Sequence, residues 1–67
     1  MIKKVFKLKG LDYFVIGVTD KNSAVIVALA NRIGITENDL VETDYKLKPD
    51  VRPIVVRSEE ELLTYLN

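Results

Sequence analysis

The sequence contains no cysteine and no histidine among its 67 residues. Without cysteine, disulfides and thiolate metal sites cannot stabilise the fold, and the composition fits a reducing compartment, so we expect a cytoplasmic protein. Without histidine, the chain lacks the usual general base and the commonest metal ligand. Its three glycines are isolated, so there is no glycine-rich phosphate-binding loop. These absences predict a protein that is not an enzyme and that uses no cofactor and no metal.

Long hydrophobic runs are also lacking, because the longest apolar stretches are residues 13–18 and 24–30. A transmembrane helix needs about 20 apolar residues, so we expect no membrane contact. The chain predicts a single domain, residues 1–67, which is too small to enclose a typical pocket of about 300–1,000 Å³. One core of this size supplies only about 3–5 kcal/mol, and self-association would bury further apolar surface. We therefore expect a homodimer.

The first part of the chain has the pattern of a β-hairpin. Apolar and lysine side chains alternate over residues 2–9, and residues 13–19 are rich in β-branched and aromatic types. Gly10 suits a two-residue turn between these strands. Gly17 inside the second strand indicates a bulge or a close approach of another backbone segment.

A helix is predicted over residues 23–33, because an apolar run follows a cluster of capping residues. Gly34 is expected to end it in the left-handed conformation. For residues 36–44 the sequence supports two alternatives, a helix and a strand. Thr36 and Asp39 imitate a capping box, whereas residues 41–48 alternate as a strand would.

The last part of the chain predicts a short strand and a final helix. The strand covers residues 54–57, and Ser58 is placed to cap the helix that follows. Leu62, Leu63 and Leu66 form the apolar stripe of this helix. The sequence therefore predicts a small α+β domain with a four-stranded, mostly antiparallel sheet, two helices and the order ββαββα. Residues 6–9 match residues 45–48, which suggests a duplicated ββα unit.

Residues 25–45 locally resemble the helix-turn-helix of DNA-binding proteins. The resemblance is carried by a small residue, a turn glycine and two buried positions, which are Ala30, Gly34, Ile35 and Leu40. It implies that residues 36–44 form a helix that reads DNA. Their charge has the wrong sign for DNA binding, because they carry four acidic residues and no Lys or Arg. DNA phosphates attract basic side chains and repel acidic ones. We therefore favour a plain connection between a helix and a strand.

Nucleic-acid association through lysines is the alternative function. Lys3, Lys7 and Lys9 share one face of the first strand, and Lys46 and Lys48 would extend that face if the duplicated strands lie together. A solvated lysine face that discourages edge pairing explains the same pattern. We favour this second explanation.

The helix over residues 23–33 is apolar on two sides. A wheel of about 100° per residue places its larger apolar residues on one face, the expected core stripe: Val25, Ile26, Leu29 and Ile33. The opposite face is small and uncharged: Ala24, Val27, Ala28 and Asn31. Either other parts of the chain or a second molecule covers this small face. As a hypothesis we take it as an interface, in a small non-enzymatic regulatory or accessory protein that contacts itself and another, unidentified protein.

Overall fold

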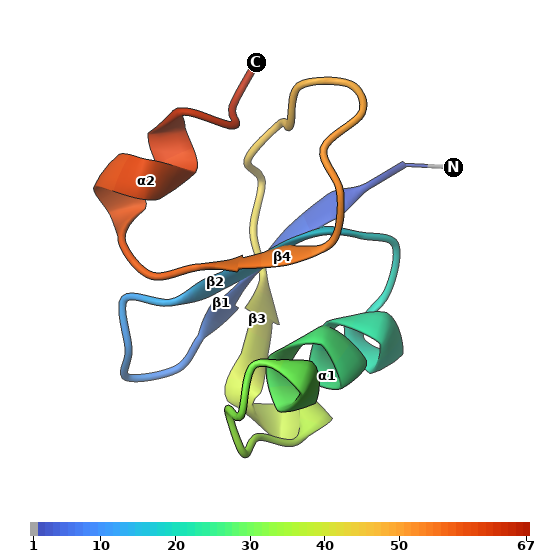
Figure 1. Cartoon of the computed structure of the whole chain (residues 1–67), viewed down its shortest axis with the longest axis vertical. Coiled ribbons are helices and arrows are strands. Elements are labelled where there is room, and N and C mark those ends of the chain that lie inside the picture. The colour runs from blue at the N-terminus through green and yellow to red at the C-terminus, as the bar shows by residue number, and fades with distance from the viewer. Residues whose placement is uncertain (1) are drawn as a thin grey trace.

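The computed structural model describes residues 2–67, and Figure 1 shows a twisted sheet with its helices. The sheet is antiparallel, in the order β3-β1-β2-β4, and consists of β1 (Lys4–Leu8), β2 (Phe14–Val18), β3 (Leu40–Glu42) and β4 (Ile54–Val56). The helical elements are α1 (Lys21–Ala30), the 3-10 turn η1 (Glu37–Asp39) and α2 (Glu59–Leu63). This confirms the predicted α+β fold, its four antiparallel strands and the order ββαββα. No helix within residues 2–67 has the length and apolar character that crossing a membrane requires.

The two central strands are buried on both faces of the sheet. On one face, Phe6 and Leu8 pack under α1. On the other face, Val5 lies in a second cluster with Leu62 of α2 and with Val51. The alternation over residues 2–9 places Val5 on the same face as Lys3, Lys7 and Lys9, and the expectation that this face is solvated was wrong at Val5. That face is covered because the chain between β3 and β4 crosses it and α2 packs on it.

The hairpin that joins β1 and β2 has a longer loop than predicted. The Leu8 N–H donates to the Tyr13 carbonyl over 3.0 Å, which leaves four residues in the loop instead of two. The Leu11 N–H donates to the Leu8 carbonyl over 3.4 Å, and Gly10 has a φ of +75°. A positive φ at this position is typical of a type II turn.

Gly17 forms the predicted bulge. Lys4 pairs with Val18 and Val5 pairs with Ile16, so Gly17 has no partner in β1. Its φ is +77°. The Arg52 backbone lies directly against the Gly17 Cα, in the space that a Cβ would occupy. Both sequence expectations at Gly17, the bulge and the close backbone approach, are therefore confirmed.

Helix α1 begins earlier and ends earlier than predicted. Asp20 caps it, because its carboxylate accepts the Ser23 N–H over 2.7 Å. At the other end the Ile33 N–H donates to the Ala28 carbonyl over 2.9 Å, which is a Schellman closure. The left-handed residue is Arg32, with a φ of +64°, and not Gly34. Ending the helix here lets Ile33 fold back onto the core.

The cap at Asp20 makes the stability of α1 depend on pH. The Ser23 backbone N–H, and then the Ser23 hydroxyl, lower the pKa of the Asp20 carboxyl below its ordinary value. Such a group stabilises the fold above its unfolded pKa of about 3.9, and this contribution is lost as the pH falls through the lower folded value. Between about pH 5 and pH 2, we expect the free energy of unfolding to fall more steeply for the wild type than for Asp20→Asn. The asparagine oxygen accepts the same bond without titrating.

Urea unfolding followed by circular dichroism at several pH values measures this difference. Asp20→Ser is the matched control, because serine also caps a helix and does not titrate in this range. The two variants should show the same shallower pH dependence. If the curves of all three proteins ran parallel, the cap would not be coupled to the proton.

The open region 36–44 contains both a helical turn and a strand. The Thr36 N–H donates to the Asp39 carboxylate over 2.9 Å, which confirms the capping interaction, and η1 follows. Strand β3 then ends at Glu42, so the predicted strand over residues 41–48 is wrong beyond that residue. The reason lies at Tyr45, whose ring packs edge-on against the buried Phe14 ring, with 6.3 Å between the two ring centres. This contact on the second face draws the chain away from β1.

Helix α2 starts at the predicted cap. The Ser58 hydroxyl accepts the Glu61 N–H over 3.0 Å, and the Asp12 carboxylate of the hairpin loop accepts the Glu59 N–H over 3.2 Å. Leu62 is fully buried as predicted, but Leu63 is 57% exposed, so it does not belong to the buried stripe.

The second half of the chain does not repeat the first as a ββα unit. Strands β1 and β2 are paired neighbours, whereas β3 and β4 lie at opposite edges of the sheet. Residues 45–48, which match part of β1 in sequence, lie outside β3. The suggested duplication is therefore wrong, because a short alternation of lysine and apolar residues does not specify a strand partner.

Candidate functional site

The orientation of α1 decides which of its residues a partner can reach. Ala24 and Ala28 are 0% exposed and face the sheet, whereas Ile26 is 62% and Leu29 is 54% exposed. The expected core stripe was therefore wrong at Ile26 and Leu29. Alanines in this position let the helix backbone come close to the large side chain of Phe6 in the same core cluster.

The hypothetical interface at Ala24, Val27, Ala28 and Asn31 is corrected accordingly. Ala24 and Ala28 are inaccessible, because the protein's own sheet covers them. Val27 is partly buried against the same cluster. Asn31 is exposed, and its amide donates to the Val27 carbonyl over 2.9 Å at the helix end. The small face could be covered by the same chain or by a second molecule, and at both alanines it is the same chain that covers it.

The apolar surface that α1 does expose lies on the opposite side. We define the outer face of α1 as Ile26, Leu29 and Ala30, which are all exposed. Residues three and four apart are neighbours on a helix, so these side chains form one strip. Between Lys21 and Arg32 the chain has no charged residue. Sequence reasoning missed this face because it assigned the largest side chains to the core; the alanine pair four residues apart was the available signal.

Comparison with known proteins gives no match. No family model matches the chain, and neither does any curated protein or solved structure. What the protein does is therefore inferred from its surfaces.

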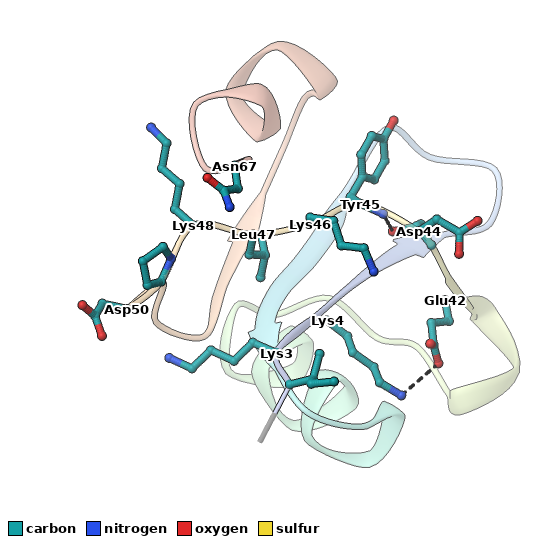
Figure 2. A pocket seen from close by; sticks show the side chains of 13 residues that line it. Lys3, Lys4, Glu42, Asp44, Tyr45, Lys46, Leu47, Lys48, Asp50 and Asn67 are labelled. Atoms are coloured by element: carbon teal, nitrogen blue, oxygen red, sulfur yellow. Dashed lines mark hydrogen bonds and ion pairs between the residues drawn. The ribbon is translucent and has the colours of Figure 1, made fainter.

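A second surface feature is a groove of about 700 Å³ between the start of β1 and the chain after β3 (Figure 2). The sequence led us to expect no pocket of this size. The groove arises because two chain segments diverge at the molecular surface, so no enclosing wall is needed. Its lining includes residues 2–4, residues 42–50 and Asn67.

The five lysines proposed to contact a polyanion do not form one surface. Lys3, Lys46 and Lys48 line the groove, but Lys7 and Lys9 do not. The Lys7 ammonium group instead donates to the Leu11 carbonyl over 2.9 Å and lies 6.0 Å from the centre of the Phe14 ring. The divergence of residues 43–50 from β1 is the reason for this separation.

Two of the groove lysines have partners within the protein. The Lys3 ammonium group donates to the Val51 carbonyl over 2.8 Å. The Lys4 ammonium group forms an ion pair with the Glu42 carboxylate over 3.3 Å. These contacts tie the start of β1 to the chain on either side of the groove.

The other charged side chains differ in direction. Figure 2 shows the Lys46 side chain pointing into the groove, whereas Asp44 and Asp50 point away from it near its two ends. Lys48 stands on the wall and points outward. The middle of the groove is therefore positive. Within residues 2–67, no group of three or more acidic side chains is arranged to hold a metal ion.

Proposed function

We propose that this chain is a small non-catalytic protein-binding module, of the regulatory or accessory kind, which pairs with a second copy of itself through the outer face of α1. The observation that supports this proposal is the exposure of Ile26 and Leu29 next to each other on one helix. Contiguous exposed apolar side chains tend to mark interaction sites, whereas isolated ones are ordinary.

The chemistry of the face favours a second copy as the occupant. Because the strip is uncharged, two copies can meet there without burying an unpaired charge. In an antiparallel pair, the helix dipoles also attract each other, and Lys21 of one copy approaches the C-terminal end of the other helix. The acidic turn η1, with Glu37 exposed, packs against α1 of its own copy and lies beneath the C-terminal end of this helix in Figure 1.

The size of the face sets the expected affinity. A helix of ten residues is about 15 Å long, which is short against a standard interface of about 800 Å² per partner. Interfaces below the standard size are typical of weak and transient complexes. We expect a dissociation constant in the micromolar range.

Sedimentation equilibrium over a range of micromolar concentrations tests the dimer. Ile26→Lys and Leu29→Lys should each weaken self-association by at least about tenfold, because each would bury an unpaired ammonium group. The matched control is Leu63→Lys, which removes an equally exposed leucine from α2 and should leave the dimer unchanged. A wild type that stays monomeric at high micromolar concentration would refute the proposal.

Nucleic-acid association is less well supported. It relied on a continuous lysine surface, and the groove carries only part of that set together with carboxylates. A salt titration against generic DNA distinguishes the two functions. No affinity at low salt would exclude the nucleic-acid function, since phosphate contacts are strongest there.

A further inference from the structure

The groove has a strand edge along one wall. Pairing between β1 and the chain after β3 ends where the Thr43 N–H donates to the Val5 carbonyl over 3.0 Å. Successive residues of a strand direct their main-chain groups to alternate sides. Lys3 lies directly before β1, and if the extended backbone continues there the same alternation would direct its N–H and carbonyl to the side on which the chain has departed. That side is the groove, which Lys3 lines.

The opposite wall is a second extended segment. The Lys48 N–H donates to the Tyr65 carbonyl and the Asn67 N–H donates to the Lys46 carbonyl, both over 2.8 Å. These bonds place Leu47 opposite Leu66 in an antiparallel bridge. Because Lys46 and Lys48 direct their main-chain groups toward the C-terminal segment, Leu47 directs its own groups to the other side. Figure 2 shows the groove and β1 on that side.

We propose that the groove binds an extended acidic segment of another protein by strand addition between β1 and residues 46–48. Both walls offer main-chain donors and acceptors, which supply the affinity in this mode of peptide recognition. The side chains select the charge through Lys46, which points into the groove, whereas the ammonium groups of Lys3 and Lys4 already have partners within the protein. A carboxylate on the face of the peptide that meets Lys46 would pair with its ammonium group.

The same charges argue against two other occupants. A second copy that added its own β1 would bring its Lys3 and Lys4 against the lysines of the groove. A nucleic acid would meet Asp44 and Asp50 at the two ends, where its phosphates would continue. It would also find no ring to stack on, because the Tyr45 ring points away from the groove.

This peptide site is separate from the outer face of α1. The groove is bounded by β1 and by residues 42–50, and none of the residues of α1 lines it. Peptide binding therefore does not depend on self-association. The dimer-weakening variant Ile26→Lys should bind the peptide as the wild type does, so failure of one proposal leaves the other standing.

The test uses the whole chain and a fluorescein-labelled, end-blocked peptide of about six residues in which valine and glutamate alternate, which spans one strand length. Fluorescence anisotropy measures the affinity. Lys46→Glu should weaken binding by at least about tenfold, because it reverses the charge that faces the peptide. Lys9→Glu makes the same change at an exposed site outside the groove, and it should alter the affinity by less than about twofold.

The main-chain part of the proposal has its own variants. Lys3→Pro removes the N–H that faces the groove and should bind the peptide more weakly than Lys3→Ala, which keeps it. A peptide methylated on alternate backbone nitrogens should also lose binding, and amide chemical shifts should move in residues 2–4 and 46–48. Absence of binding by the glutamate peptide, equal binding by the methylated peptide, or binding of only a single-stranded oligonucleotide would each overturn the proposal.

Discussion

Gly17→Ala is expected to unfold the protein at 25 °C. An alanine Cβ would overlap the Arg52 carbonyl oxygen and lie 2.9 Å from the Pro53 nitrogen. These are main-chain atoms, so they cannot rotate out of the way as a side chain does. The φ of +77° adds backbone strain for any residue other than glycine. Together the overlap and the strain should cost about 3–5 kcal/mol, which equals the stability that a single core of this size supplies.

The other two glycines separate these two causes. At Gly10 the φ is +75° but nothing lies within 4 Å of a new Cβ, so Gly10→Ala should cost about 1 kcal/mol from strain alone. Gly34 has open space and no positive φ, so Gly34→Ala should leave stability unchanged or raise it slightly. Urea unfolding followed by circular dichroism gives all three values. Equal losses at Gly10 and Gly17 would mean that the Arg52 backbone moves aside freely.

Ala28→Arg is the second substitution with a large expected effect. Ala28 is 0% exposed between α1 and the sheet, and the described core contains no buried polar or charged residue that would pair with a guanidinium group. The new side chain must either push α1 off the sheet or bury an unpaired charge, and each costs several kcal/mol. We expect a chain without cooperative unfolding and without dispersed amide resonances.

Ile26→Arg is the matched control on the same helix. Ile26 is 62% exposed, so an arginine there extends into solvent and should change the stability of the monomer by less than about 0.5 kcal/mol. The contrast between the two variants reports directly on the orientation of α1. A folded Ala28→Arg protein together with an unfolded Ile26→Arg protein would show that the helix packs through its larger side chains.

The features that the sequence alone determined are local. The caps at Ser58 and Thr36 depend on contacts within a few residues, and both were recognised. The order of strands and helices follows from short-range periodicity for the same reason. Gly17 was also recognised as special, although the Arg52 backbone that packs against it is distant in sequence. The end of α1 was misplaced by three residues and its left-handed residue by two, because the packing of Ile33 outweighed the preference of Gly34 for a left-handed angle.

The orientation of α1 and the groove were decided only by the tertiary structure. A helix that is apolar on two sides has no preferred core face until it packs on a sheet. Here α1 packs through Ala24 and Ala28, because small side chains permit close contact between the helix and the sheet. The groove joins residues 2–4 to residues 42–50, which come together only when the chain leaves β1 after Thr43. A periodic pattern reports which side chains share a face. Which partner covers that face is set by contacts between distant segments.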